Sequence, residues 1–278
     1  MSVSRPAHRF LAHLAADERI PAAHVAVVVA HADDETIGLG AQLPRLAGVR
    51  IVHVTNGSPR NPVYARRRGF ASGEAYAAQR QSELEAALAL AGVPASALTN
   101  LGVIDQDAPL HLVAIARRLA EFFGDHDIAV VLTHAFEGGH PDHEATAFAV
   151  REAADLLARR DPGREPLIVE MPYYRAGETG WLTQSFLPRP DCPELTIWLD
   201  EAQRELKRRM YAAHGSQRDI LELFPIGAER FRQAPRYDFT APPHEGELLY
   251  EREDWGLTRE RWRELVRNAQ AELRGTSS

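Results

Sequence analysis

The chain has 278 residues, of which 45% are hydrophobic and 26% are charged, an ordinary composition for a folded globular protein. Its net charge of -7 gives no sign of the basic surface that binding to nucleic acid requires, so we predict no nucleic-acid partner. The single cysteine, Cys192, excludes an intramolecular disulfide scaffold.

Hydropathy along the chain gives a first expectation about location. No apolar run approaches the roughly 20 residues that cross a bilayer, so we predict no membrane span. The apolar stretch 10–16 is short and is interrupted by His13, which is not the pattern of a signal peptide. We therefore expect a cytoplasmic protein, and the composition leaves a homo-oligomer open.

The first eighty residues predict a β-α-β unit. Residues 24–30 form a continuous, β-branched apolar run, typical of a strand buried on both faces of a parallel sheet. A helix to about Leu46 follows, and 50–55 reads as a second strand. This order favours a right-handed crossover and a doubly wound α/β sheet.

Later segments continue the alternation of strands and helices. The apolar spacing predicts strands at 98–104, 128–133, 166–171 and 195–199, and helices at 79–91, 112–123, 141–157, 200–213 and from about 258. Residues 56–78, rich in Gly and Arg, read as a long loop, and 225–250 read as irregular. We predict one α/β, Rossmann-like domain over 1–278, with a mostly parallel sheet and helices on both faces. Its core covers about 20–175, with a C-terminal elaboration over about 176–278.

Two motifs place histidines and carboxylates where strands end and helices begin. The first is His31-Ala32-Asp33-Asp34-Glu35, and the second is His140-Pro141-Asp142-His143-Glu144. Zinc prefers imidazole nitrogens and carboxylate oxygens, and a catalytic zinc site has three protein ligands. Both motifs fall at the carboxyl edge of the predicted sheet, where open α/β folds build their sites.

These motifs yield a specific set of candidate residues. We predict one zinc ion per chain, bound by His31, Asp34 and His143. Asp33 is then free to act as the base for the attacking water, and Asp142 is placed to orient His140. Either motif alone would equally fit a helix cap beside a surface histidine. Their joint occurrence at strand ends favours the metal site.

With these motifs the chain resembles the PIG-L/LmbE-like zinc de-N-acetylases. The resemblance covers at least 25–150 and continues in Arg80-x-x-Glu83, in Leu101-Gly102 and in Ala213-His214-x-Ser216-Gln217. It implies an LmbE-like fold and removal of an N-acetyl group from N-acetylglucosamine within a larger molecule, a small-molecule amino-sugar substrate. It also implies roles for seven residues: His31, Asp34 and His143 as zinc ligands, Asp33 as general base and then acid, His140 with Asp142 as oxyanion stabiliser, and Arg80 as a substrate-contacting residue. We further predict His214 as a substrate-binding residue.

The chain departs from the family pattern at two positions. Ala32 stands where the family usually has proline, which we expect to affect only the rigidity of the turn. Gly138 stands where some members have an assisting tyrosine, so Tyr173 or Tyr174 is a hypothetical substitute.

Several other residues leave alternatives open. Arg60, Arg66, Arg67 and Arg68 together with Arg80 indicate either an anionic substrate or a solvated helix face. Trp181, Trp198 and Trp255 are either sugar-stacking or core residues. His214 is either a site residue or a cation at a helix C-terminus.

Three competing functions remain at the level of sequence. Some proteins of this fold family are zinc hydratases of unsaturated dicarboxylic acids, for which arginines would also suit the substrate. A thiol-conjugate amidase would use the same metal residues. A non-catalytic sugar-binding module is the third reading, and it is disfavoured because the candidate metal and catalytic residues His31, Asp33, Asp34, His140 and His143 are all intact.

Overall fold

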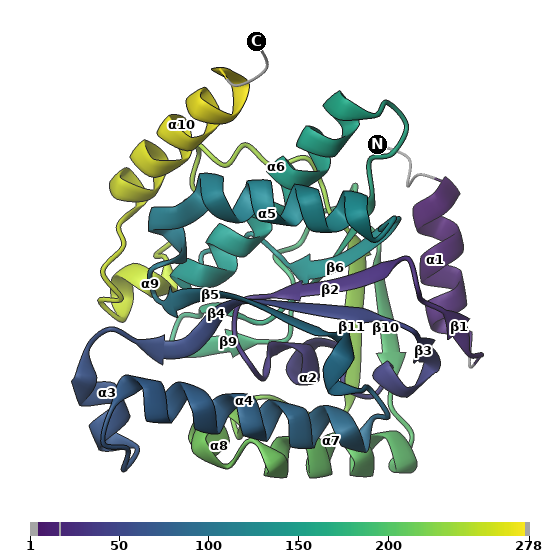
Figure 1. Cartoon of the computed structure of the whole chain (residues 1–278), viewed down its shortest axis with the longest axis vertical. Coiled ribbons are helices and arrows are strands. Elements are labelled where there is room, and N and C mark those ends of the chain that lie inside the picture. The colour runs from purple at the N-terminus through teal and green to yellow at the C-terminus, as the bar shows by residue number, and fades with distance from the viewer. Residues whose placement is uncertain (1–4, 17, 276–278) are drawn as a thin grey trace.

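A computed structural model of the protein describes residues 5–16 and 18–275 and is built around a seven-stranded sheet (Figure 1). The strand order is β10-β11-β7-β6-β2-β4-β5. The strands are β2 (Val25–Val29), β4 (Arg50–Pro59), β5 (Leu98–Asp105), β6 (Val130–His134), β7 (Leu167–Met171), β10 (Glu194–Trp198) and β11 (Ala228–Gln233). The five strands from β7 to β5 are parallel, and β11 and β10 add an antiparallel edge. The predicted mostly parallel α/β sheet is confirmed.

Helices cover both faces of this sheet, seen above and below it in Figure 1. One face carries α5 (Leu112–Asp125), α6 (Pro141–Arg160) and α10 (Arg259–Gly275). The other carries α2 (Asp34–Leu39), α4 (Gly73–Leu90), α7 (Glu201–Ala213) and α8 (Arg218–Leu221), with α1 (Arg5–Ala15) beside them. The remaining elements are β1 (Ile20–Pro21), β3 (Leu46–Ala47), α3 (Pro62–Arg67), β8 (Tyr174–Ala176), β9 (Trp181–Thr183), α9 (Leu249–Arg252) and the 3₁₀ turns η1 (Leu43–Arg45), η2 (Ala95–Ala97), η3 (Ala108–His111) and η4 (Gly215–Gln217).

The position of β2 at the centre of the sheet explains why every residue of this strand is apolar. Ala26 and Val28 pack into the core under α5 and α6, while Val25, Val27 and Val29 pack into the core on the opposite face. Alternate side chains of a strand point to opposite faces, so a strand covered by helices on both sides must be apolar throughout.

The chain order of the strands creates a switch point between β2 and β6. From β2 the chain builds outward through β4 and β5, then crosses back to β6 on the other side of β2 and continues to β7. Crevices at the carboxyl ends of strands at such a reversal are where open α/β sheets bind ligands. Both sequence motifs follow these two strands.

The C-terminal part of the chain joins the same sheet. Strand β11 pairs antiparallel with β7, and α10 packs its buried face on the core beneath α5. The single-domain organisation stays a prediction, which these contacts support. Among the residues described, no helix has the length and apolar character needed to cross a bilayer.

The predicted loop 56–78 is the largest difference from the sequence-based elements. Strand β4 extends to Pro59, and two helices follow it. Helix α3 begins after Asn61, whose side chain accepts from the Val63 backbone N–H, and α4 begins after Ser72, which caps Ala75 in the same way. N-cap side chains satisfy the free N–H groups of a first turn, so helices form where a loop was expected.

Candidate metal centre and pocket

The two motifs meet at the switch point. His31 lies two residues beyond β2, Asp34 is the first residue of α2, and His143 lies in the first turn of α6. His31 Nδ1 is 3.4 Å from Asp34 Oδ2, and His143 Nε2 is 3.3 Å from both Asp34 Oδ1 and His31 Nδ1. All three side chains are buried.

This spacing fits a tetrahedral metal ion. Ligand atoms about 2.0–2.1 Å from a tetrahedral zinc lie roughly 3.3–3.4 Å from one another. The two imidazole nitrogens stand at that separation from each other, and each stands at that separation from one oxygen of Asp34. Two imidazoles with one carboxylate are a donor set that zinc accepts. The residues present therefore fit a single divalent metal ion.

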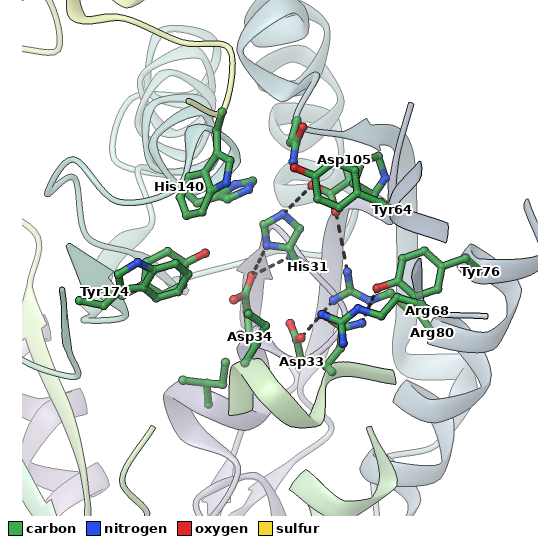
Figure 2. Close-up of a pocket in the computed structure, with 17 residues that line it drawn as sticks. His31, Asp33, Asp34, Tyr64, Arg68, Tyr76, Arg80, Asp105, His140 and Tyr174 are labelled. Carbon is green, nitrogen blue, oxygen red and sulfur yellow. Dashed lines mark hydrogen bonds and ion pairs between the residues drawn. The ribbon is translucent and has the colours of Figure 1, made fainter. Parts of the chain in front are cut away.

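A second layer of carboxylates faces the other side of His31. Its Nε2 is 3.2 Å from Asp142 Oδ2 and 3.4 Å from Asp105 Oδ1 (Figure 2 shows His31 and Asp105). Burial opposes a charge on His31, but the carboxylates of Asp105, Asp142 and Asp34 raise its pKa well above the usual value. Three carboxylates, those of Asp34, Asp105 and Asp142, thus surround His31, and this excess of negative charge favours binding of a metal cation.

Asp142 corrects one expectation. Its carboxylate was predicted to orient His140, but Oδ2 lies 3.8 Å from His140 Nδ1 and only 3.2 Å from His31 Nε2. His140 Nδ1 accepts instead from the Asp142 backbone N–H, at 3.2 Å. The reason is that the carboxylate also accepts from the N–H groups of Gln106 and Ala108, which turn it toward His31.

Sequence reasoning missed two residues of this centre. Asp105 was read only as part of an acidic turn, and His134 was given no role. His134 ends β6, stacks on His143 with ring centroids 3.9 Å apart, and accepts from the Ala30 N–H at 2.9 Å. Burial and the nearby His143 lower its pKa well below the usual value, so it is a neutral ring. Their positions at the carboxyl ends of β5 and β6 were the available signal.

Asp33 lies beside the metal ligands and is paired with Arg80 (Figure 2). Arg80 Nη2 is 3.1 Å from Asp33 Oδ2, and the guanidinium also donates to the carbonyls of Gly57 and Ala32. Burial raises the pKa of Asp33 to about 7, while Arg80 acts to lower it. Arg80, predicted to bind the substrate, is thus 4% exposed and holds Asp33 at the edge of the pocket.

His214, also predicted to bind the substrate, is fully buried and lies outside the pocket lining. Its Nε2 is 3.4 Å from Thr36 Oγ1 and 3.9 Å from Glu35 Oε1, and Glu35 in turn bonds His53 at 3.0 Å. It directly follows α7, whose end is packed against α2. Burial lowers the pKa of His214, which favours a neutral ring and argues against the second interpretation, a cation at the C-terminus of the helix.

Two of the four arginines at positions 60–68 are neutralised by ion pairs. Arg60 pairs with Asp107, and Arg68 makes two bonds to Asp219, whereas Arg66 and Arg67 are exposed. This arrangement supports the reading of a solvated helix face over a strongly anionic substrate site.

The pocket over this centre has a volume of about 180 Å³. Asp33, Asp34 and His31 lie at its centre, with aromatic side chains such as Tyr174 on one side and the charged side chains of Arg68 and Arg80 on the other (Figure 2). The lining residues are His31, Asp33, Asp34, Ile37, Pro59, Tyr64, Arg68, Tyr76, Arg80, Asp105, Gln106, His140, Tyr174, Trp181, Gln217, Ile220 and Trp255. Tyr174 therefore faces the pocket, whereas Tyr173 donates its hydroxyl to the Asp34 carbonyl behind it.

Comparison with solved structures shows this fold in several deacetylases. The A40926 pseudoaglycone deacetylase Dbv21 is 21% identical with a TM-score of 0.57, covering 78% of this chain and 98% of its own. A triple mutant of the deacetylase of teicoplanin biosynthesis is 21% identical with a TM-score of 0.58, covering 77% and 99%. The N,N'-diacetylchitobiose deacetylase from Pyrococcus horikoshii is 21% identical with a TM-score of 0.55, covering 84% and 94%. These likenesses establish the fold.

Comparison by sequence gives one result with a family and none with individual proteins. No curated protein matches the chain. Residues 26–154 match the model of the PIG-L family, described as GlcNAc-PI de-N-acetylase. This range contains both metal motifs, Asp105 and His134, and with it the resemblance to the PIG-L family predicted from the sequence is confirmed.

Proposed function

We propose that this protein is a zinc-dependent de-N-acetylase that hydrolyses the acetamide of an N-acetylglucosamine-containing small molecule. The observation that carries the proposal is the convergence of His31, Asp34 and His143 at metal-binding distances beside the Asp33 carboxylate. The family match over 26–154 and the deacetylase fold support the choice of an amide substrate.

The arrangement of His31 prepares the metal site. Asp142 and Asp105 face Nε2, so this nitrogen keeps its proton, and Nδ1, which is directed toward Asp34 and His143, is the atom that would bind a metal in place of a proton. A histidine that donates its second N–H to a carboxylate is a better-oriented and more basic metal ligand. His31, Asp34 and His143 would hold the zinc ion, which would supply the Lewis acidity needed to polarise the acetyl carbonyl and ease deprotonation of a water.

Asp33 is the proposed general base. It lies next to Asp34 and lines the pocket, where its Oδ2 accepts from Arg80, so the carboxylate is held in place to take a proton from the attacking water. The same carboxyl then donates that proton to the leaving amine. A pKa raised to about 7 by burial suits both halves of this transfer near neutral pH.

His140 is the proposed stabiliser of the oxyanion. It lines the pocket, and its Nδ1 accepts from the Asp142 N–H, so the ring proton of the neutral form sits on Nε2. Burial, with His31 nearby, lowers the pKa of His140 well below its usual value, which keeps the ring neutral. A fixed N–H donor in a site that excludes water stabilises developing negative charge more than water would.

The test is acetate release from a panel of N-acetylglucosaminides by the zinc-loaded protein, beside Asp33→Asn. The panel runs from the free sugar through chitobiose and nucleotide sugars to inositol-linked sugars and glycosylated antibiotics. We expect acetate from the wild type and a loss of roughly 10²-fold or more in Asp33→Asn, which keeps its metal, the usual scale for general acid–base catalysis. Equal turnover in the variant would remove Asp33 from its role.

The hydratase alternative receives less support from the pocket. A dicarboxylate substrate calls for free cations, but Arg68 and Arg80, the two arginines in the lining, are paired with Asp219 and Asp33. Turnover of an unsaturated dicarboxylate by a metal-loaded protein that releases no acetate would favour that alternative.

A further inference from the structure

One wall of the pocket has no part in the proposed amide hydrolysis. It consists of Tyr174, Trp181 and Trp255, which we call the aromatic wall. Tyr174 and Trp181 stack with centroids 4.7 Å apart, and Trp255 meets Trp181 edge to face at 5.7 Å. Trp255 also lies 4.8 Å from the ring of His140, so the aromatic wall begins directly beside the reacting centre.

The aromatic wall lies at the edge of the core, because Trp255 and Tyr174 pack against the core clusters on one side. All three side chains are only partly buried and line the pocket, whereas Trp262 is 2% exposed within the core. Trp198 is the opposite case, 74% exposed and away from the pocket. Large aromatic surfaces left open to a pocket are typical of ligand contacts.

The chain holds the aromatic wall in place. Trp181 donates Nε1–H to Glu253 Oε1 at 3.0 Å, which ties β9 to the end of α9. Arg252 donates to the carbonyls of Gly177 and Gly180 at 2.8 and 2.9 Å, which closes the turn between β8 and β9 onto the same helix. A wall ordered before the ligand arrives loses little freedom on binding, which favours affinity.

The size of the pocket limits what lies beneath the aromatic wall. About 180 Å³ is below the roughly 300 Å³ of pockets that enclose a drug-sized ligand. The space over the metal residues therefore admits the acetamido sugar, and a group attached to that sugar lies toward the mouth. Other aromatic and apolar side chains also line the pocket, among them Ile220 and Tyr64, which is 40% exposed on α3.

We propose that the aromatic wall is a subsite for a flat, C–H-rich ring joined through the glycosidic bond to the acetylated sugar. This inference rests on the proposed deacetylase function. The indole N–H of Trp181 is already used by Glu253, so Trp181 offers the face of its ring and not a hydrogen-bond donor. Such faces bind the C–H face of a second pyranose or an aryl aglycone, and they favour neither a phosphate nor a carboxylate.

The test compares three substrates: N-acetylglucosamine, N,N'-diacetylchitobiose and p-nitrophenyl N-acetylglucosaminide. We expect kcat/KM to be at least about 10-fold higher for one or both linked-ring substrates than for the free sugar. Trp181→Ala should lower that ratio about 10-fold, through KM, while Trp181→Phe keeps most of it. Trp198→Ala is the matched control and should leave the ratio unchanged. A preference for chitobiose identifies the ring as a pyranose, and one for the nitrophenyl glycoside as an aglycone.

A binding experiment separates this inference from the proposed function. Calorimetry with metal-loaded Asp33→Asn measures the affinity for the same three compounds without turnover, and the additional change Trp181→Ala should weaken only the linked-ring compounds. Acetate release with equal kcat/KM for all three would overturn the subsite and leave the deacetylase intact. No acetate from any compound would overturn both. A ratio that falls equally in Trp198→Ala would also refute the subsite.

Discussion

The metal centre and the aromatic wall face the same pocket, but they are built in different ways. The metal residues come from the carboxyl ends of β2 and the first turns of α2 and α6, and all are buried. The aromatic wall comes from a short hairpin and a loop in the C-terminal part, and its side chains are partly buried. The first is fixed by the topology of the parallel sheet, whereas the second depends on a few local hydrogen bonds. We infer that the sheet sets the chemistry and the C-terminal part sets the choice of substrate.

Removing one of the metal ligands should have the largest effect on the metal centre, because both metal binding and activity depend on it. His31→Ala deletes a donor that faces Asp34 and His143 on one side and Asp142 on the other. We expect bound metal to fall from about one per chain to near zero. Acetate release should fall by more than the roughly 10²- to 10⁴-fold that loss of a general base costs. Metal analysis and an acetate assay measure the two effects.

The control for this variant is His111→Ala, which removes an exposed histidine and should keep metal and activity. A His31→Ala protein that retained stoichiometric zinc would exclude His31 as a ligand.

A change at Asp142, which contacts His31 Nε2, should affect the metal centre less than the loss of a metal ligand does. Asp142→Asn keeps the size of the side chain but weakens its bond to His31 Nε2. Partners of a metal-binding histidine typically contribute 10- to 100-fold in affinity or activity, so we expect a loss of about that size in zinc affinity. A competition titration with a chelator gives the affinity. Asp155→Asn on the same helix, an exposed partner of Arg236, should change nothing. Equal affinities in the two variants would show that Asp142 does not position His31.

The pairing of Asp33 with Arg80 predicts a change in pH dependence. Burial raises the pKa of Asp33 and Arg80 opposes that rise, so Arg80→Gln should raise the pKa further. The base must be deprotonated to act, hence kcat/KM rises with pH through this pKa. The acidic limb of the profile should therefore move to higher pH, by about 1 unit. Arg67→Gln, at an exposed position, serves as the control. An acidic limb that stayed in place or moved to lower pH would contradict the pairing.

The sequence was sufficient for the residues whose place follows from the sheet. His31, Asp34 and His143 converge because parallel strands end at one edge, and an apolar run followed by ligand types marks that edge. The helix starts after Asn61 and Ser72 could also have been predicted, because both residues are good N-caps. They were overlooked because the segment is rich in Gly and Arg and was therefore interpreted as a loop. Strand β11 lay in a segment read as irregular, because pairing with β7 decides its conformation and its own apolar pattern does not.

Other residues could not be placed from the sequence because their partners are distant along the chain. Asp142 turns toward His31 under the influence of two backbone N–H groups near 107, more than thirty positions away. His214 is buried because α7 packs on α2, and the sequence around His214 contains no pattern that predicts this packing. The aromatic wall likewise brings together side chains about eighty positions apart, so spacing alone could not separate these tryptophans from core residues.

The change with the smallest expected effect, Arg252→Ala, tests the aromatic wall without altering the metal centre. Arg252→Ala removes the bonds that tie α9 to the carbonyls of Gly177 and Gly180, in a side chain that is 24% exposed. Because hydrogen bonds of this kind contribute about 1 kcal/mol net, we expect Tm to fall by a few degrees. The preference for linked-ring substrates should drop a few-fold, while bound metal stays at about one per chain. Arg236→Ala, which loses an exposed ion pair with Asp155, is the matched control and should leave that preference intact. If Arg252→Ala lowered the metal content as well, the two regions would not be independent, and the division of chemistry from substrate choice would fail.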